Sequence, residues 1–590
     1  MDGDGRDESM EDPGSWSQKR QAYLPVAIAF LALVLFALAL IIATKGSRPS
    51  GCPSCNCAGE FDPDIGLLTQ GGSEEESQNE LGFGLAIFIM TLSFCIVASF
   101  LISEHSFFNL PDCLSYVFIG IMIGLILRLS GISATAGYAL PNQEQFFLFI
   151  IPPIIFEAGY SLSKADFFRQ SGSILVFAVV GTIITALFWG LGMYLLGTLA
   201  VSYKFRLWEA LTFGALVSAV DPVATLAIFN ALKVNRTLHY LVFGESVVND
   251  AVAIVLYHTF AQMIGSSRPH WYVPIFSFVY IFAGSVVIGV LTSALAALIL
   301  KHLSLSKQPT LELAFYMLMA YVPYFMCEGF GMSGIMGILT GGVLLAHYAH
   351  PNLSTVTQIS SNYCFKSIAY LTETFVFVYL GTALTTFNHS WDSATVAFAI
   401  VLTLASRAAN IFPLSRVVNK YRGNAKIDAK NQFIMWFSGL RGAIAFALSL
   451  NFPGGNEVTR RVVISTTLAI VLFTVIVLGG GTLPILQLLR VEGAATASKN
   501  QKHVSHLEGR DMDTFAAGQE HPTPDEGRKG WLERMDEIYF KPWLTNPADA
   551  ANQRSTAATF QRLANLSGEG GEALTPHHIG SMFDGLEEPM

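Results

Sequence analysis

Six carboxylates of this sequence lie inside long apolar runs, where a charged side chain needs a partner or a chemical task. Their positions are Glu157, Asp221, Glu245, Asp250, Glu328 and Glu373. At the centre of a bilayer a charge costs at least about 2.5–3.5 kcal/mol. Only two bases, Arg407 and Arg441, lie in comparable runs. Because two bases cannot neutralise six acids, we expect some of these carboxylates to bind protons or cations.

The densest group of polar residues is Glu-Ser-Val-Val-Asn-Asp at 245–250. On a helix Asn249 and Asp250 follow Ser246 by three and four residues, so hydroxyl, amide and carboxylate share one face. Oxygen ligands of this kind suit a small, hard cation. The spacing therefore predicts a cation site on this helix.

A second feature lies in the run Ser218-Ala-Val-Asp-Pro222. Proline removes a helical hydrogen bond and frees nearby backbone carbonyls. At membrane depth, freed carbonyls are tolerated only where they line a cavity or bind something. Because secondary transporters build ion sites from broken helices, a break beside Asp221 is typical of such a site.

The rest of the sequence supplies the helices that must position these residues. The chain of 590 residues is 52% hydrophobic and 13% charged, against roughly 25% charged for a soluble domain. Apolar runs long enough to cross a bilayer predict an all-α membrane protein, with one hydrophobic segment at 24–43 and thirteen helices within 81–491. The predicted helices are 81–103, 110–129, 144–162, 172–200, 207–232, 240–266, 271–300, 310–328, 332–348, 362–386, 393–419, 430–452 and 461–491.

The N-terminal segment, residues 1–80, has two features that the sequence leaves open. The apolar run 24–43 follows two basic residues and is either a signal anchor or a cleaved signal peptide. The cluster of Cys52, Cys55 and Cys57 favours a disulfide or free thiols. A zinc site would need a second pair of ligands nearby.

Basic residues in the short loops predict the orientation. The loops on the side of the C-terminal tail hold eleven Lys and Arg, against six on the other side, which favours a cytosolic tail at 492–590. The glycosylation sequon at Asn388 then faces the lumen, whereas those at Asn235 and Asn352 face the cytosol. A net charge of −9 without a basic stripe gives no reason to expect nucleic-acid binding.

Four motifs follow one another between about Leu81 and Val491. They are Phe147-Leu-Phe-Ile-Ile-Pro-Pro-Ile-Ile-Phe-Glu-Ala-Gly-Tyr160, Ser218-Ala-Val-Asp-Pro-Val-Ala-Thr225, Phe243-Gly-Glu-Ser-Val-Val-Asn-Asp250 and Phe437-Ser-Gly-Leu-Arg-Gly-Ala-Ile-Ala-Phe446. Together they resemble the sodium/proton exchanger family of cation/proton antiporters. Two further segments, Met435-Trp-Phe-Ser-Gly and Tyr539-Phe-Lys-Pro-Trp-Leu-Thr545, are similar to the endomembrane type of Golgi and endosomes.

The resemblance implies a homodimer of thirteen-helix protomers, with two inverted six-helix repeats and interrupted, crossing fifth and twelfth helices. Carried over by position, the cation- and proton-binding residues are Asp250, Asp221, Asn249, Ser246, the carbonyl of Val220, and Glu157 from the third helix. Asp250, Asp221 and Ser246 are the expected ligands of the transported Na⁺ or K⁺. The other implied partners are the lipid bilayer and cytosolic regulators of the tail.

The remaining buried charges are expected to be structural. For Glu245 and Arg441 the resemblance and the energetics both favour an ion pair, because removing one partner of a buried pair costs about 3–5 kcal/mol. For Glu373 and Arg407, a second pair and solvation in an aqueous funnel are equally good interpretations. Glu328, near a helix end, is expected to be an interfacial acid rather than a ligand.

The function that the resemblance implies is electroneutral exchange of Na⁺ or K⁺ for H⁺, regulating organellar pH and cation content. Golgi and endosomal membranes are favoured over the plasma membrane, and neither an enzymatic activity nor a cofactor is expected. Two alternatives are disfavoured. One is an intramembrane serine protease using Ser333 and His258, and the other is a cation channel, for which the sequence has no T-V-G-Y-G filter.

The tail begins as a polar linker after Gly493 and becomes amphipathic at about 528–545. Trp531, Met535, Ile538 and Tyr539 recur at helical spacing there. We expect this segment to dock on the membrane or beneath the helix bundle.

Overall fold

The computed structural model of the chain describes the helical core and one segment of the tail. The described residues are 89–98, 112–129, 146–162, 164–221, 229, 236–264, 272–303, 305–387, 389–422, 426–453, 456–482, 485 and 535–545. The predictions that lie outside them concern the hydrophobic segment 24–43, the state of Cys52, Cys55 and Cys57, the sequons at Asn235 and Asn388, and the polar linker after Gly493.

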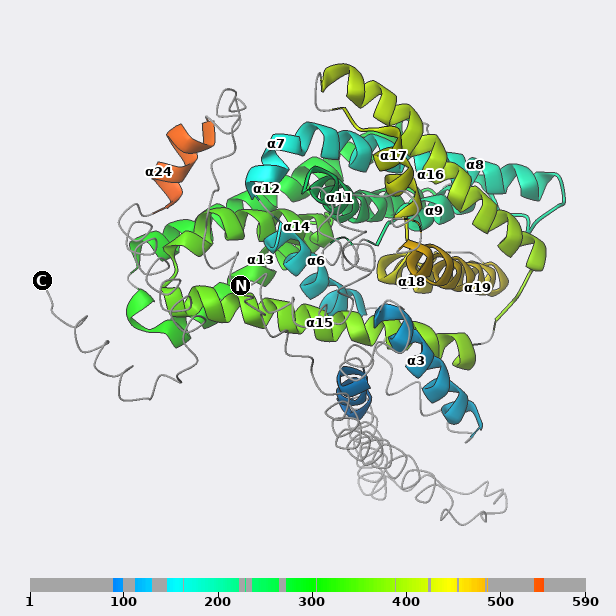
Figure 1. Ribbon diagram of the computed structural model, residues 1–590, viewed down its shortest axis with the longest axis horizontal. Helices are drawn as coiled ribbons and strands as arrows, with labels where there is room; N and C mark the ends of the chain where they lie inside the picture. Colours follow the sequence, from blue (N-terminus) through cyan, green and yellow to red (C-terminus); the bar gives the residue numbers. More distant parts are fainter. Residues whose placement is uncertain are drawn as a thin grey trace, which may run out of the picture. The chain divides into compact units, whose positions relative to one another are not determined.

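Within this described part of the chain, every element is a helix except one isolated antiparallel bridge between Asp221 and Leu440 (Figure 1). The α-helices are α3 (Asp112–Leu129), α6 (Ile151–Tyr160), α7 (Lys164–Leu175), α8 (Gly181–Thr198), α9 (Leu207–Ser218), α11 (Arg236–Ala261), α12 (Val273–His302), α13 (Pro309–Gly329), α14 (Gly334–Leu344), α15 (Thr355–Thr386), α16 (Ser393–Tyr421), α17 (Ala429–Phe437), α18 (Ala443–Leu450), α19 (Glu457–Phe473) and α24 (Lys541–Leu544). Short π or 3-10 turns are η1 (Phe146–Ile150), η2 (Val176–Val180), η3 (Leu305–Lys307), η4 (Leu345–Ala349), η5 (His350–Asn352), η6 (Thr474–Gly479) and η8 (Asp536–Phe540). The predicted all-helical fold is confirmed.

Seven of the described helices are long and apolar enough to cross a membrane, by length and composition. They are Gln170–Thr198, Leu238–Ala261, Val273–His302, Pro309–Gly329, Thr355–Thr386, Ser393–Lys420 and Glu457–Thr482. Shorter apolar helices cover Ile89–Ala98, Cys113–Ile126, Leu148–Tyr160 and Leu207–Ser218. The last of these is short because the predicted run 207–232 stops being helical after Ser218.

The described chain divides into two compact units. The first contains Gly172–Phe282 and Ser367–Lys499 together with the chain up to Ile155. The second contains Phe156–Ser171, Ala283–Lys366 and the tail from Asn500. Each unit therefore combines segments that are far apart in the sequence.

Backbone contact between α8 and α9 holds the centre of the first unit. A Cβ added to Gly214 would lie 2.3 Å from the carbonyl oxygen of Ala186, and one added to Gly190 would lie 2.8 Å from that of Ala210. Small residues allow this close approach, on which helix association in lipid depends. The packing fixes α9, the helix that ends at the polar cluster.

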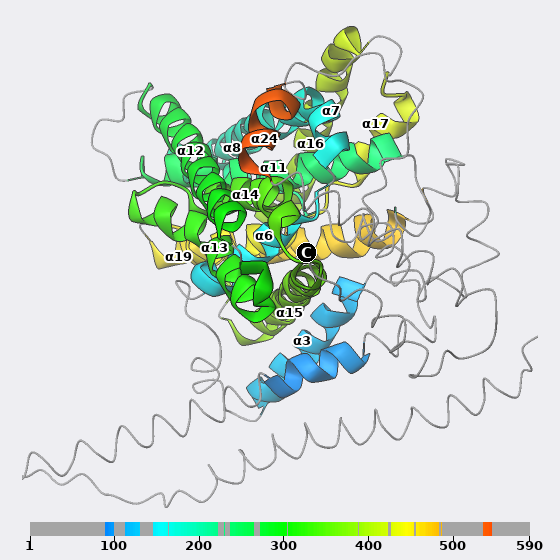
Figure 2. The same ribbon diagram turned by 90° about the vertical axis from the view of Figure 1, so that its left-hand side faces the viewer.

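In the second unit, α13 and α14 pack through a similar contact. A Cβ on Gly337 would lie 2.4 Å from Cys327 Sγ and 3.0 Å from the carbonyl oxygen of Pro323. The tail helix α24 belongs to this unit and lies beside the end of α12, where Lys301 binds the carbonyl oxygen of Pro542 (Figure 2). The described part of the tail is therefore docked against the end of α12 within the second unit.

Candidate functional site

The first element of the site is the end of α9. The backbone N–H of Arg206 donates to Glu209 Oε2 at 3.0 Å, which caps the first turn of α9. The helix stops at Ser218, and Ala219 is extended with φ −60° and ψ 133°. The backbone N–H of Asp221 then donates to the carbonyl oxygen of Leu440 at 2.9 Å. The predicted interruption is present, and it begins before Pro222 rather than at it.

The second element is the break between α17 and α18, which divides the predicted run 430–452. The non-helical residues between them are Ser438 to Gly442. Glycine is required at 442, because a Cβ there would lie 1.8 Å from Asp221 Oδ2. The bridge and this contact show that the two interrupted helices meet at Asp221.

Arg441 joins the two breaks through the backbone. Its side chain is fully buried, and Nη1 donates to the carbonyl oxygens of Ser218 at 3.2 Å and Ala219 at 3.0 Å. The last carbonyls of a helix lack intrahelical donors and carry partial negative charge. The guanidinium therefore satisfies the carbonyl of Ser218, the last residue of α9, and that of Ala219 just beyond it.

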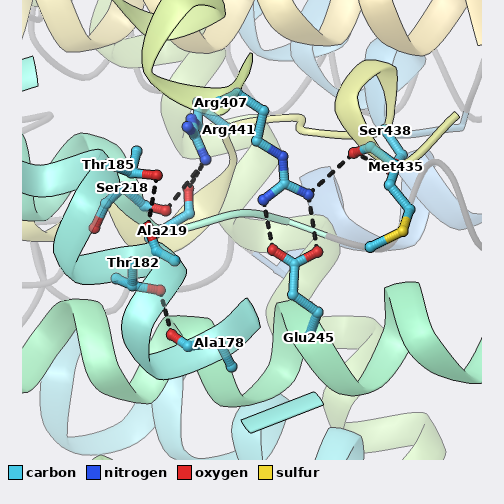
Figure 3. A network of polar contacts seen from close by, with 11 residues as sticks. Ala178, Thr182, Thr185, Ser218, Ala219, Glu245, Arg407, Met435, Ser438 and Arg441 are labelled. Atoms are coloured by element: carbon cyan, nitrogen blue, oxygen red, sulfur yellow. Dashed lines mark hydrogen bonds and ion pairs between the residues drawn. The ribbon is translucent and has the colours of Figure 1, made fainter. Parts of the chain in front are cut away.

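Glu245 pairs with Arg407, which corrects the prediction of a Glu245–Arg441 pair (Figure 3). Arg407 Nη1 donates to Glu245 Oε1 at 2.5 Å, and Nη2 donates to Oε2 at 2.8 Å and to the carbonyl oxygen of Met435 at 3.1 Å. Both side chains of the pair are at most 3% exposed. The exchange of partners has a physical reason: the carbonyls that end α9 hold the guanidinium of Arg441.

The same contacts overturn the alternative pairing of Glu373 with Arg407, since the bidentate fork of Arg407 faces Glu245. Glu373 is half-buried on α15. Glu328 accepts a hydrogen bond from the N–H of Gly334 at 3.0 Å, just beyond the end of its own helix. The expected interfacial position of Glu328 stays a prediction.

Asp250 lies on α11 with the neutral ligands that the spacing predicts. Its carboxylate interacts with the backbone of Val220 and electrostatically with Asp221, Arg441 and Glu245. Ser246 Oγ and Asn249 Oδ1 are buried and have no hydrogen-bond partner in the described part of the chain. The arrangement offers two carboxylates and two unpartnered neutral oxygens, a set suited to binding a cation.

Two predicted residues belong to the second unit. Glu157 on α6 belongs to the second unit, where Ser161 and Lys366 are its polar and charged neighbours. Ser333 caps α14 by accepting a hydrogen bond from the N–H of Met336 at 3.3 Å. The Ser333 hydroxyl therefore has a structural role, whereas the protease alternative assigned it to catalysis.

Three contributors to the site are absent from the sequence-based prediction. They are the carbonyl oxygen of Leu440, the hydroxyl of Thr474, which accepts from the N–H of Arg441 at 3.1 Å, and Gly442. Leu440 and Gly442 both lie in the quoted motif 437–446, on either side of Arg441, but the motif does not indicate which atom of either residue contacts Asp221. A threonine on another helix carries no signal in the sequence.

Comparison with known proteins agrees with this geometry. Residues 89–488 match the family model "Sodium/hydrogen exchanger, transmembrane". The chain is 42% identical over 493 residues to sodium/hydrogen exchanger 8 of Homo sapiens, covering 80% of this chain and 85% of that protein. It is 37% identical over 429 residues to sodium/hydrogen exchanger 5 of Arabidopsis thaliana, covering 71% and 82%.

Among solved structures, the sodium proton antiporter MjNhaP1 from Methanocaldococcus jannaschii has a similar fold. The TM-score is 0.53 at 18% identity, over 70% of this chain and 99% of that chain. The sequence match to a transporter family agrees with the prediction that the chain is not an enzyme. Its motifs, its broken helices and these matches together show that the chain belongs to the sodium/hydrogen exchanger family.

Proposed function

We propose that the protein exchanges Na⁺ or K⁺ for H⁺ across a Golgi or endosomal membrane and thereby regulates organellar pH and cation content. The observation that carries this proposal is the pair of buried, unpartnered oxygens, Ser246 Oγ and Asn249 Oδ1, on the helix that bears Asp250. Burying a polar group without a partner costs roughly 1–3 kcal/mol. Coordination of a dehydrated cation recovers that cost.

Exchange follows from competition for Asp250. A bare carboxylate in the closed site is penalised by loss of solvent, so the site changes sides only when a proton or a cation occupies it. A cation in the site is held by Asp250 and Asp221, with Ser246, Asn249 and the carbonyl of Val220 as neutral ligands. The Glu245–Arg407 pair and Arg441 hold the two helix breaks in place around it.

Asn249 sets the stoichiometry. An amide does not titrate near neutral pH, so Asp250 is the single carboxylate that exchanges its proton for a cation. We expect Asp221, which lies at the two helix breaks, to stay ionised throughout the cycle. It then contributes no proton to the exchange. One cation then replaces one proton, and the cycle is electroneutral.

For the architecture, we propose a homodimer of thirteen-helix protomers with two inverted repeats and a cytosolic tail open to regulators. Alternating access is a rigid-body movement of the bundle that carries Asp250. Glu157 approaches the site from the third predicted helix.

The test is cation-driven proton flux in vesicles containing the purified protein. Asp250→Asn keeps the shape of the side chain and removes its charge, so exchange is lost while the protein stays folded. Asp392→Asn is the matched control, because this acid lies beside Thr395 at the start of α16 and keeps wild-type flux. Coupled exchange by folded Asp250→Asn would contradict the assignment.

The same vesicles test the stoichiometry and the cation. At imposed membrane potentials, the flux of the wild type is expected to be indifferent to voltage, and a transport current would contradict one-for-one exchange. Asn249→Asp adds a second carboxylate, and its flux becomes voltage-dependent. Comparison of Na⁺, K⁺ and Li⁺ gradients identifies the transported ion.

A further inference from the structure

The described tail segment, Met535–Thr545, is held on the second unit by backbone carbonyls. Lys301 Nζ, in the last turn of α12, donates to the carbonyl oxygens of Pro542 at 2.9 Å and Trp543 at 3.0 Å. The buried Asn352 donates to the carbonyl oxygen of Leu544 at 2.8 Å. Within the described segment, Leu544 is buried, with 3% of its surface exposed.

A polar cluster holds the other end of the segment. Asp536 accepts hydrogen bonds from Tyr348 at 2.5 Å and from His347 Nε2 at 2.8 Å, and Lys541 Nζ lies 3.6 Å away. His347 and Tyr348 belong to η4, which continues α14. The segment therefore docks where α12, a candidate membrane span, and the α14–η4 helix end.

The outer side of the segment is apolar. Met535, Tyr539 and Trp543 recur at intervals of four residues and are 40%, 64% and 60% exposed, and Phe540 is 45% exposed. These four side chains are too few to form a stable interface between proteins, which buries about 800 Å² on each partner. Aromatic residues of this kind concentrate where lipid headgroups meet acyl chains.

The surface of α12 shows which medium lies beside them. Val287, Leu291 and Leu295 form an exposed stripe along this candidate span, at 54%, 64% and 55% exposure. The stripe leads to the turn that carries Lys301, which binds the tail. A lysine at the end of an apolar helix keeps its amine at the membrane surface. The aromatic side chains of the tail therefore lie at the depth of the interface.

We propose that Met535, Tyr539, Phe540 and Trp543 form an interfacial anchor, whose partner is the headgroup–acyl boundary of the membrane that the protein spans. The anchor attaches the tail to the bilayer and to the second unit at once. Coverage of these side chains by another protein or by a second copy of the chain is the alternative that the experiment separates from membrane contact.

The experiment uses the full chain in lipid nanodiscs, with its seven native cysteines replaced by serine and transport checked. A bimane fluorophore is attached to Trp543→Cys, and quenching by a nitroxide on shallow lipid acyl carbons is compared with quenching by aqueous iodide. The control is Glu457→Cys on the exposed first turn of α19. At position 543 we expect lipid quenching at least twice iodide quenching, with the reverse at 457.

Release of the dock provides a second measurement. Lys301→Met is expected to reduce lipid quenching at position 543 at least twofold, whereas Lys307→Met, which removes an exposed lysine from η3, leaves it unchanged. Iodide quenching at 543 equal to that at 457 would overturn the anchor. Protection from both quenchers would overturn it too, because protein would then cover the segment. Tyr539→Cys, labelled in the same way, must give the same result as 543.

Discussion

Two regions of the molecule use the same contact in different surroundings. In the first unit, Arg441 binds the carbonyl oxygens of Ser218 and Ala219 with no exposed surface. In the second unit, Lys301 binds those of Pro542 and Trp543 where solvent reaches it. Charges interact far more strongly away from water, so the buried contact is expected to support folding and the exposed one only the docking of a segment.

The most direct test of this comparison is to remove the positively charged side chain from each region. Arg441→Met leaves the carbonyls of Ser218 and Ala219 without a donor and removes the positive charge near Glu245 and Asp250. We therefore expect the free energy of unfolding to fall by about 3–5 kcal/mol, as for other buried charges. Lys301→Met is expected to cost less than about 1 kcal/mol, because water replaces the amine. Thermal unfolding in detergent measures both. Equal shifts in Tm would show that burial does not set the difference.

The identity of the buried pair can be tested next. Glu245→Met and Arg407→Met each strand one charge, and the double variant removes both, so it is expected to regain most of the stability lost. Glu245→Met combined with Arg441→Met is the control, and it is expected to be additive or worse. If Glu245→Met regained more stability when combined with Arg441→Met than with Arg407→Met, the Glu245–Arg441 pairing that the sequence favours would be correct.

Backbone spacing in the first unit gives a smaller effect. Gly442→Ala places a methyl group against Asp221, and we expect exchange to fall at least tenfold while the protein stays folded. Gly480→Ala is the matched control, since a Cβ there has nothing within 4 Å. Equal flux in the two variants would show that the position of Asp221 does not matter for exchange.

The smallest effect concerns pH and the tail. Burial opposes ionisation of Asp536, but hydrogen bonds from His347 and Tyr348 and the charges of His347 and Lys541 outweigh it and lower its pKa below the ordinary 3.8. A lowered pKa stabilises the docked state fully above the ordinary value and loses that contribution as pH falls through the lowered one.

Iodide quenching of a label at position 543 should therefore stay constant near neutral pH and rise only in strong acid. Asp536→Asn should show raised quenching at neutral pH and little further change on acidification. A wild-type transition near pH 6 would assign the dependence to another group.

The elements that the sequence predicts well are those encoded locally. Helical spacing places Ser246, Asn249 and Asp250 on one face, and Pro222 marks the interrupted helix. The partner of Glu245 could not be predicted, because counting charges treats Arg407 and Arg441 alike. Their distinction depends on where the carbonyls of α9 end, which only the packed structure shows.

The tail illustrates the same limit. Its amphipathic pattern is visible in the sequence, but its contacts come from Lys301 at the end of α12 and from His347 and Asn352 in the turns that follow α14. The sequon at Asn352 is another example, because its amide nitrogen donates to the carbonyl oxygens of Ala297, Tyr348 and Leu544. A sequence motif does not reveal that its side chain is already occupied.

The glycine contact between α8 and α9 has a mechanical consequence. Where Gly190 and Gly214 meet, backbone rests on backbone, so no layer of side chains is available to repack as one helix slides along the other. We therefore expect α8 and α9 to move as one rigid body, without sliding along each other. During transport, we expect the hinges to lie at the ends of this rigid body, at η2 before α8 and at the extended residues after Ser218.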